Sequence, residues 1–462
     1  MRFRVSLHII LLSGGIALLL SACHIIKPYQ SPVIADNHLY RDIAATDTNT
    51  IATLHWKEIF TDTLLQQLVA EGIRNNLDLQ VAWSRMRQAT ASYSQSRQAL
   101  YPAVNADAGA TIAGASNQQR TGRSVIPQQY SAQLTATWEA DIWGKLRSSR
   151  RAGLAAMLQA TANAQAVQTG LIADIANNYY NLMALDQQLA ITQKTVVNWQ
   201  ATVEVMKELK KADVVTGAAV VQSEASRYAA EVTIPDLKQS IRETENTINL
   251  LLGRVSGPVA RGSIDQQEPV MLLKTGVPAQ LLANRPDVRA AEYNLRYYFE
   301  QTNVARTYFY PALTISASGG YTSYFSLTGP GSWLSNLAAG LAQPVFNQGV
   351  NKTRLKIAQE QQQQAALGFR TAVLTAGQEV SNALYSYQTA QEKANSRRLQ
   401  LQNLQLSVEY TQELVRYGFA NYTEVLNAQQ SLLSAQLNKI NDHLQQLQAI
   451  VFLYRALGGG WQ

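Results

Sequence analysis

The chain carries two copies of one module, and this internal duplication limits the possible folds more than any other feature of the sequence. A shift of 209 residues aligns the region after position 77 with the region after position 286, and a shift of 205 residues aligns the later part of each half. The aligned pairs are Asp78 with Asp287, Ala82 with Ala291, Tyr101 with Tyr310, Pro102 with Pro311, Asn177 with Asn382, Tyr180 with Tyr385, Glu208 with Glu413, Val220 with Val425, and Gly253 with Gly458. Because the order is kept, every element predicted in the first half has a counterpart in the second.

Each half predicts two β-strands that have one apolar and one polar face. Apolar and polar residues alternate over 103–112 and 133–142 in the first half, and over 313–322 and 337–341 in the second, before Pro344. Strands of about 9 to 12 residues have the length that a tilted outer-membrane strand requires. The residues expected to face water are Asn105, Asp107, Thr135, Thr137, Thr314 and Ser316, and those expected to face lipid are Leu134, Trp138 and Ile315.

Very long helices are predicted after each pair of strands. Gly144 and Gly349 mark the return to helix, and the next break signals lie at 212–217 and at Gly418. A helix of about 65 residues extends about 100 Å. A shorter helix is predicted over 76–100, with Leu77, Val81, Met86 and Ala89 as its apolar side, and a further helix closes each half. Apolar stripes at helical spacing comprise Leu171, Ile175, Tyr179, Leu182 and Leu185, and in the last helix Leu432, Ala435, Leu437, Ile440, Leu444 and Leu447.

Four strands per chain are too few to close a barrel, and an open sheet edge is not tolerated in hydrocarbon. Three copies would supply twelve strands, an even number within the range of outer-membrane barrels. We therefore predict a mainly α protein with transmembrane β-strands: a trimeric 12-stranded β-barrel, four strands per protomer, continuous with a long periplasmic α-helical barrel. The number three depends on this count together with the resemblance described below.

The predicted segments follow the duplication. They are a lipoprotein signal peptide (1–22), an N-terminal lipid-anchored segment (23–75), a first repeat (76–257) with strands at about 102–115 and 130–143 and a long helix at about 144–210, a linker (258–284), and a second repeat (285–462) with strands at about 311–324 and 333–346 and a long helix at about 349–417.

The first residues predict export and lipidation. Arg2 and Arg4 precede an apolar stretch over 9–20, which is shorter than the ~20 residues that span a bilayer. Leu20, Ser21 and Ala22 then precede Cys23, the only cysteine of the chain, which excludes an intrachain disulfide. This sequence is similar to the bacterial lipobox, so Cys23 is expected to carry acyl chains. His24 stands where lipoproteins retained in the inner membrane often have Asp, which implies an outer-membrane location.

Several classes of function are disfavoured by the sequence. The basic residues are spread along the chain without a run of five, although nucleic-acid binding needs a concentrated basic face. The histidines at 8, 24, 38, 55 and 443 lack the spacing of a metal site, and no phosphate loop or nucleophile motif is present. We therefore expect no enzyme, no cofactor, no metal and no nucleic acid. A passive lipoprotein scaffold is the nearest alternative, but it does not explain two hairpins of membrane length.

The sequence resembles the TolC-related, NodT-type outer membrane factors of resistance-nodulation-division efflux systems. The matching stretches are 56–62 (WKEIFTD), 284–292 (NRPDVRAAE), 310–311 (YP), 432–436 (LLSAQ) and 457–461 (LGGGW). The resemblance implies an exit duct of a tripartite pump, with a homotrimer, a periplasmic adaptor (membrane fusion) protein, an inner-membrane transporter and outer-membrane lipid as partners. It favours efflux of drugs or other toxic solutes, and leaves a type I protein secretion duct as an alternative.

In that family the turns after the long helices form a periplasmic tip, which docks the adaptor. Relatives commonly have Arg-Tyr-x-x-Gly at both turns. Here the second turn has Arg416, Tyr417 and Gly418, whereas the first has Lys210 and Lys211 and lacks the glycine. The resemblance therefore predicts docking at both turns, with a changed first turn.

The resemblance also implies a gate at the start of the last helix. Thr423, Asn427 and Gln430 lie about one helical turn apart, where relatives tend to have Leu, Asp and Arg. A ring of Asn427 lacks the negative charge that favours cations. Glu424 or Asp213 would have to supply any charge, and both are equally well explained as solvated surface groups.

Three further motifs are expected to be structural. Arg285, Pro286 and Asp287 form a helix start, because Pro is favoured in the first turn and Asp meets the positive end of the helix dipole. Trp56 and Phe60 are expected to pack the N-terminal segment on the helices. The glycines at 458–460 are expected to end the last helix.

Overall fold

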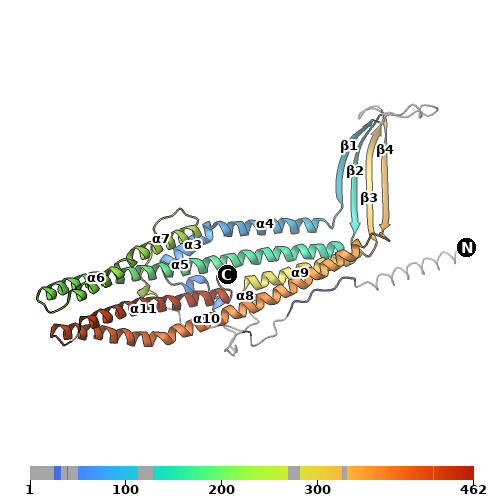
Figure 1. Cartoon of the computed structure of the whole chain (residues 1–462). Helices are drawn as coiled ribbons and strands as arrows, with labels where there is room; N and C mark the ends of the chain where they lie inside the picture. Colours follow the sequence, from blue (N-terminus) through green and yellow to red (C-terminus); the bar gives the residue numbers. More distant parts are fainter. Residues whose placement is uncertain are drawn as a thin grey trace. The chain divides into compact units, whose positions relative to one another are not determined.

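The computed structural model describes residues 25–32, 39, 50–112, 128–268, 281–324, 330–419 and 421–461 (Figure 1). Cys23 and the predicted signal peptide lie outside these residues. The helices are η1 (Ile51–Thr53), α2 (Trp56–Ile59), α3 (Thr63–Asn75), α4 (Leu77–Gln98), α5 (Lys145–Lys211), α6 (Gly217–Glu231), α7 (Thr233–Leu251), η3 (Ile264–Gln266), α8 (Leu281–Asn284), α9 (Pro286–Thr307), α10 (Val350–Arg416) and α11 (Tyr422–Ala456). The strands are β1 (Ala103–Ile112), β2 (Gln128–Ala140), β3 (Ala312–Ser323) and β4 (Gly331–Ala342). The predicted fold class, mainly helical with two hairpins in a duplicated chain, is confirmed. No helix among the described residues combines the length and the hydropathy needed to cross a membrane.

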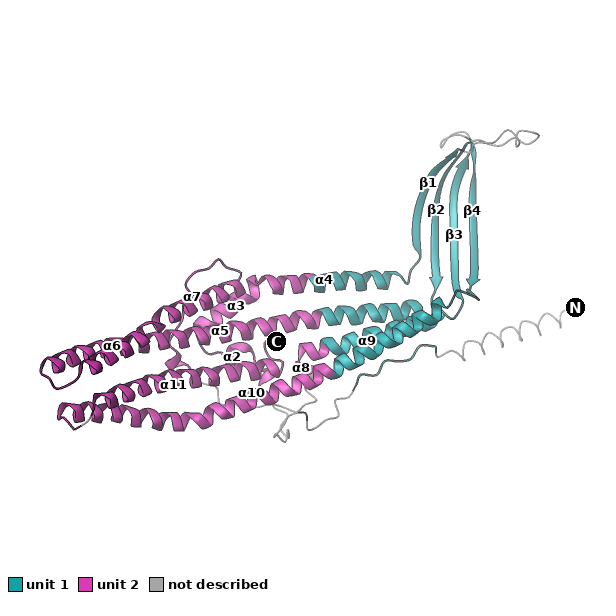
Figure 2. Cartoon of the chain, in the orientation of Figure 1, with its two compact units in different colours: residues 1–32, 85–160, 290–370 teal, residues 33–84, 161–289, 371–462 magenta. Residues whose placement is uncertain are grey.

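The chain forms two compact units (Figure 2). Unit 1 comprises residues 1–32, 85–160 and 290–370, and unit 2 comprises residues 33–84, 161–289 and 371–462. Each unit draws segments from both halves of the sequence. The two halves are therefore repeats of sequence that pack together, and not separately folded domains.

Unit 1 contains the four-stranded sheet, which has the order β1-β2-β3-β4 and is antiparallel throughout. Residues that face one another across neighbouring strands share a face of the sheet. Asn105 lies opposite Thr135, and Thr137 lies opposite Ser316, so the predicted polar residues share one face. Trp138 lies opposite Ile315 on the other face. The predicted separation of polar and apolar faces is therefore confirmed.

The apolar stripes predicted on the long and last helices pack in the interior of unit 2. Tyr179 and Leu182 of α5 are fully buried, and Ile440 and Leu447 of α11 are also buried. Phe60, predicted to anchor the N-terminal segment, is buried with its ring 6.0 Å from that of Tyr454. Trp56 is also buried, so the predicted role of both aromatic residues as packing anchors is confirmed.

The apolar side predicted for 76–100 is wrong at its start. Leu77 and Val81 are exposed, whereas Leu79 and Ala82 are buried. Leu77 with Val81, and Leu79 with Ala82, are both apolar pairs at helical spacing. The sequence pattern therefore fits either side of the helix. The Oδ1 of Asn76 accepts a hydrogen bond from the Leu79 N–H (2.8 Å) at the start of α4, and tertiary packing buries Leu79 and Ala82.

The further helix predicted for the first half is divided into two. α6 ends at Glu231, and α7 begins at Thr233 and carries Pro235 in its first turn. Proline has no N–H and cannot donate to the carbonyl four residues earlier, so it stops α6 but is tolerated at the start of α7. The second half has no proline at this place, and α11 is a single helix of 35 residues.

The duplication extends to single backbone conformations. Gly144 and Gly349 both have positive φ, and so do Gly253 and Gly458. A Cβ on Gly253 would lie 2.7 Å from the carbonyl oxygen of Asn75, and a Cβ on Gly458 would lie 2.4 Å from that of Asn284. The same close approach is thus built twice, and glycine is required at both places. The prediction that Gly458 ends the last helix is confirmed.

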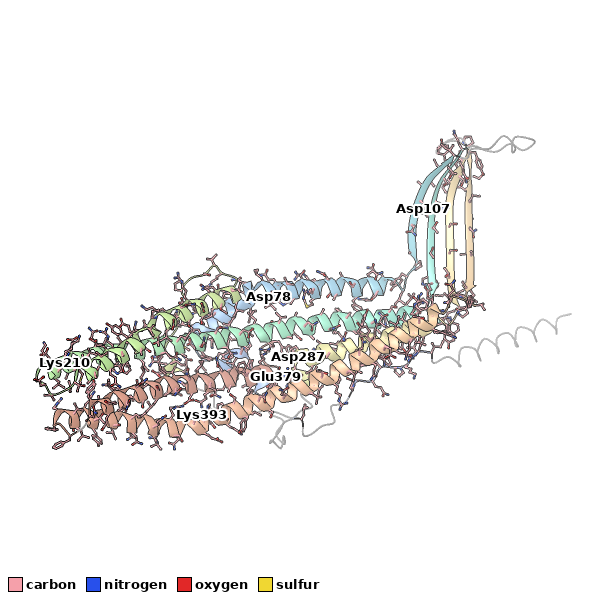
Figure 3. The ribbon with its side chains drawn as sticks, in the orientation of Figure 1. Asp78, Asp107, Lys210, Asp287, Glu379 and Lys393 are labelled. Carbon is pink, nitrogen blue, oxygen red and sulfur yellow. The ribbon has the colours of Figure 1, made fainter. Side chains whose placement is uncertain are left out.

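Arg285 is the buried connection between the start of α9 and the end of α11. Its side chain is 5% exposed, and its Nη1 donates to the carbonyl oxygen of Ala456 (2.8 Å). It also pairs with Asp287 (2.6 Å) and Glu379 (2.8 Å), both labelled in Figure 3. Burial opposes ionisation of Asp287, but the Arg285 guanidinium outweighs it and holds the pKa of Asp287 below its ordinary value.

The first half builds the equivalent connection from a neutral residue. Asn76 is the counterpart of Arg285, and its Nδ2 donates to the carbonyl oxygen of Leu251 (2.9 Å), the counterpart of Ala456. The predicted role of residues 285–287 as a helix start is confirmed, since α9 begins at Pro286. Its link to the end of α11 was not predicted.

Arg285→Ala should lower the free energy of unfolding by roughly 1–3 kcal/mol, because it leaves the Ala456 carbonyl without its donor. Arg285→Asn should recover part of this loss, because asparagine makes the equivalent bond in the first half. Thermal unfolding of the purified protein, followed by circular dichroism, measures both. Equal stability of the alanine variant and the unchanged protein would contradict the assignment.

Candidate functional site

The two turns that follow the long helices lie together at one end of unit 2. Met206 of α5 and Val220 of α6 pack with Tyr422, Val425 and Leu426 of α11 in one buried apolar cluster. The first turn joins α5 to α6 and the second joins α10 to α11 (Figure 1). Sequence positions about two hundred residues apart therefore form one structural element, which we call the turn pair (residues 204–224, 413–419 and 421–430).

Both turns close with the same backbone hydrogen bonds. The N–H of Val214 donates to the carbonyl of Leu209 (2.9 Å), and the N–H of Phe419 donates to that of Leu414 (2.8 Å). This bond needs a left-handed residue just before the donor. Gly418 supplies it in the second turn (φ 77°), and Asp213 supplies it in the first (φ 56°). The first turn thus lacks the glycine but keeps the conformation.

The helices that leave the turns also begin in equivalent ways. The side chain of Thr216 accepts from the N–H of Ala219 at the start of α6. The side chain of Asn421 accepts from the N–H of Thr423 (3.2 Å) at the start of α11. Such capping bonds are worth about 1 kcal/mol each. The first residues of α11, where the gate was predicted, are therefore held in a defined orientation.

The residues predicted for the gate lie on the side of α11 that faces away from the apolar cluster. Glu424, Asn427 and Gln430 are exposed, and Thr423 is half-buried. The opposite side carries the buried residues Tyr422, Val425, Leu426 and Gln429. Within the described part of the chain, neither Asn427 nor Glu424 has a side-chain partner. The structure brings these four residues to one face, whereas Asp213 lies in the other turn.

Charged side chains of the first turn are mostly paired with one another. Lys207 contacts Glu204 (3.1 Å) and Glu224 (3.3 Å), and Lys211 contacts Glu208 (2.7 Å). Hydrogen bonds to Glu204 and then to Glu224 raise the pKa of Lys207. Lys210, labelled in Figure 3, has no ion-pair partner among the described residues. The first turn therefore presents a free ammonium group at Lys210.

Two apolar residues of the turns were missed by the sequence reasoning. Phe419 is 82% exposed and Val214 is 64% exposed, and each follows the left-handed residue of its turn. Tyr417 is exposed beside Phe419. An apolar residue directly after the turn position in both halves is the signal that would have found them.

Comparison with known proteins identifies the chain. The sequence profile described as "Outer membrane efflux protein" matches residues 68–254 and 277–459. The chain belongs to the outer membrane efflux protein family. The two matched blocks follow the internal duplication, and together they cover most of the chain.

Relatives match this efflux protein over nearly its whole length. The toluene efflux pump outer membrane protein TtgC of Pseudomonas putida is 29% identical over 457 residues, which cover 96% of this chain and 94% of TtgC. The probable outer membrane lipoprotein SilC of Salmonella typhimurium is 27% identical and covers 98% of both chains. The outer-membrane channel OprN has a similar structure, with a TM-score of 0.86, 25% identity, and coverage of 95% of this chain and all of OprN. The predicted family and the outer-membrane location are confirmed.

The turn of this efflux protein offers a direct test of the left-handed aspartate. Asp213→Gly should stabilise the first turn by about 1 kcal/mol, because glycine adopts positive φ without steric cost. Hydrogen exchange at the Val214 amide should slow about fivefold. Asp213→Asn is the matched control, because it removes the charge while asparagine still tolerates this conformation. Equal slowing in both variants would show that the charge, and not the backbone, limits the turn.

Proposed function

We propose that this protein is the exit duct of a tripartite efflux pump. In this role it conducts drugs or other toxic solutes from an inner-membrane transporter and a periplasmic adaptor to the exterior. The observation that carries the proposal is the sheet of unit 1, with one polar face, one exposed apolar face and two open edges. A sheet with these faces separates water from lipid once its edges are closed. Nothing in the proposal requires catalysis, because the transporter supplies the energy.

A homotrimer closes the edges with the fewest assumptions. β1 and β4 each pair with one neighbouring strand, so each leaves a row of backbone groups without a strand partner among the described residues. Hydrocarbon cannot satisfy these groups. Pairing β4 of one copy with β1 of the next gives twelve strands in three copies, which is within the range of closed outer-membrane barrels. The exposed apolar side chains of Leu337 and Leu341 would then face lipid.

The turn pair serves as the gate and the docking tip in this proposal. Thr423, Glu424, Asn427 and Gln430 lie away from the packed face of α11 and would form rings in a trimer, with Asp213 as a further carboxylate. The docking residues would be Lys210, Lys211, Arg416, Tyr417 and Gly418, all of which are exposed. Rings of Thr423, Asn427 and Gln430 are neutral, so Glu424 or Asp213 would have to carry any charge of the gate.

Lipidation of Cys23 would anchor the chain close to a segment that is already fixed in unit 1. The side chain of Asn303 in α9 makes two hydrogen bonds with the backbone of Lys27. It accepts from the Lys27 N–H (3.2 Å) and donates to the Lys27 carbonyl (3.0 Å). Tyr29 and Ser31 donate to Glu292 of the same helix. Few residues separate Cys23 from these contacts, so the acyl chains would hold α9 at a defined distance from the membrane.

Single-channel conductance in a planar bilayer, measured together with the oligomer mass, tests the duct and its gate. The unchanged protein should be a trimer with a low-conducting resting state. Asn427→Asp should raise the preference for cations, because it adds a ring of carboxylates at the constriction. Asn438→Asp adds the same charge elsewhere on the exposed surface of α11 and should change selectivity less. A monomer without conductance under any condition would favour the non-conducting scaffold instead.

The anchor has its own test. Cys23→Ala should release the protein from membranes on alkaline washing or impair its outer-membrane location, because several acyl chains contribute ~0.8 kcal/mol per buried CH₂. Membrane fractionation and labelling with a radioactive fatty acid measure both effects. Unchanged anchoring together with absent labelling in the original protein would overturn the lipidation site.

A further inference from the structure

We propose that the helix ends adjoining the sheet of unit 1 carry a basic collar, which binds the headgroups of anionic phospholipids in the periplasmic leaflet of the outer membrane. The inference rests on the proposed function, because it takes the sheet to cross that membrane, and it adds the class of lipid that surrounds the duct. The collar lies in the last turns of α4 and α9 and in the first two turns of α5 and α10, all drawn in teal in Figure 2. It comprises Arg97, Arg147, Arg151, Arg306, Lys352 and Lys356.

The collar is built twice, at equivalent positions of the two repeats. Arg306 is the counterpart of Arg97 at a shift of 209, and at a shift of 205 Lys352 is the counterpart of Arg147 and Lys356 that of Arg151.

The acidic partners of the collar are not built twice. Arg147 pairs with Asp141 (3.0 Å), but the counterpart of Asp141 is Phe346. Arg151 pairs with Glu300 (2.7 Å), but the counterpart of Glu300 is Ala91. The two halves therefore share the basic residues and not the ion pairs, so pairing within the chain does not account for the collar.

Half of the collar has no acidic partner. Arg97 and Lys352 are exposed, and neither makes an ion pair with another described residue. Arg306 is half-buried, and its side chain donates to the neutral carboxamide of Asn303 (2.7 Å). Burial lowers the pKa of Arg306, because it disfavours the charged form and no carboxylate offsets it. These three charges are therefore available to an anion from outside the chain.

The long helices place basic residues where their own dipoles disfavour them. Arg147 lies in the first turn of α5 and Lys352 in the first turn of α10, and neither turn has an acidic residue. The next acidic residue of α5 is Asp174, and that of α10 is Glu360. The start of a helix is its positive end, so a cation there costs stability. A negatively charged partner outside the chain offsets this cost.

The N-terminal segment shows which side of unit 1 the collar faces. Asn303 accepts hydrogen bonds from both the Lys27 N–H (3.2 Å) and the side chain of Arg306 (2.7 Å), and it donates to Glu300 (3.2 Å), the partner of Arg151. Arg151 and Arg306 therefore lie on the side along which the N-terminal segment runs. This segment follows the proposed lipidation site by a few residues, so the side faces the membrane lipid and not the passage. The counterparts in the other repeat are expected to face the same way.

Aromatic residues mark the level of the membrane surface next to the collar. Trp138, on the apolar face of the sheet, donates to the carbonyl of Leu100 (3.0 Å). Tyr101, Phe309 and Phe346, at the junctions of helices and strands, are exposed. Tryptophan and tyrosine are enriched where a membrane meets water. The collar lies one to two helical turns beyond these residues, and the long side chains of arginine and lysine reach back to the headgroups.

Phosphate groups of anionic lipids match the collar in charge and in depth. Lysine and arginine near a membrane surface attract anionic lipids, and arginine binds phosphate with two parallel hydrogen bonds. The periplasmic leaflet consists of phospholipids, whose anionic members carry a net negative charge at the level of the phosphates. The collar would therefore enrich anionic over zwitterionic phospholipid around the duct.

Electron paramagnetic resonance of spin-labelled lipids tests the collar in the full-length protein, reconstituted into phosphatidylcholine vesicles. Labelled phosphatidylglycerol should associate with the protein more strongly than labelled phosphatidylcholine, on the order of fivefold at low salt, which is the effect of one such charge contact. The preference should disappear in 1 M NaCl, where charges are screened over about 3 Å. Arg97→Gln combined with Lys352→Gln should reduce it several-fold without breaking an ion pair.

Two matched double variants separate charge from fold. Arg97→Lys with Lys352→Arg keeps both charges and should keep the preference. Lys238→Gln with Lys393→Gln removes two exposed charges from unit 2 and should also keep it.

Three outcomes would overturn the collar. One is an unchanged preference for phosphatidylglycerol in the Arg97→Gln, Lys352→Gln variant. Another is stronger competition by inorganic phosphate than by chloride at equal ionic strength, which would assign the residues to a free anion. The third is a changed ion selectivity of the channel with unchanged lipid association, which would place the residues on the passage. A monomer by mass that keeps the lipid preference would instead overturn the proposed duct alone.

Discussion

Unpaired backbone groups at the two edges of the sheet are the constraint on which the rest of the structure depends. Within the described residues, β1 and β4 each have one strand neighbour, so one side of each strand offers N–H and C=O groups without a strand partner. In an outer-membrane protein these groups have no water to bond in the hydrocarbon. One copy of the chain is therefore an incomplete membrane structure. The exposed apolar side chains of β4 have the same origin, because they belong to a surface that only lipid or another copy can cover.

The duplication shows which interactions the fold needs and which residues are interchangeable. A donor to the last carbonyl of the closing helix is needed twice, and Asn76 supplies it in one half and Arg285 in the other. A left-handed residue is needed in both turns, and Asp213 replaces the glycine that stands at 418. The geometry is kept in each case while the side chain changes. The two halves can therefore differ in surface charge at the turn pair without losing their common architecture.

Much of the fold was predictable because its signals are periodic and occur twice. Alternation with period two identified the strands, and the missing breaks over about 65 residues identified the long helices. The packed side of α4 was not predictable, because Leu77 and Leu79 belong to two stripes that fit the helical period equally well. The link from Arg285 to Ala456 joins positions far apart in sequence, and no local pattern encodes it. Both failures concern tertiary contacts. Such contacts determine which of several structures compatible with the local sequence is formed.

The candidate site was predicted less completely than the fold. The positions of the two turns and the shared face of Asn427 and Gln430 follow from helix spacing. The left-handed conformation of Asp213 does not follow from helix spacing. An aspartate in a turn is as often a solvated charge as a residue with positive φ. Exposed Phe419 and Val214 were missed because a single apolar residue has no periodicity. Comparison of the two halves at a shift of 205 would have shown that both turns end on an apolar residue.

Under the proposed function, the polar face of the sheet leaves the choice of solute to other parts of the pump. Asp107 and Glu139 are the charged residues among the described positions of that face, and Glu139 is paired with Lys145 (3.0 Å). Its remaining polar side chains are hydroxyls and amides, as in the row formed by Asn105, Thr135, Ser318 and Asn336. Neutral groups of this kind hydrate a passage without binding one class of solute strongly. Under the proposed function the duct would therefore pass the solutes that the transporter delivers. Within the duct, only the charge and the width of the gate at the turn pair would discriminate among solutes.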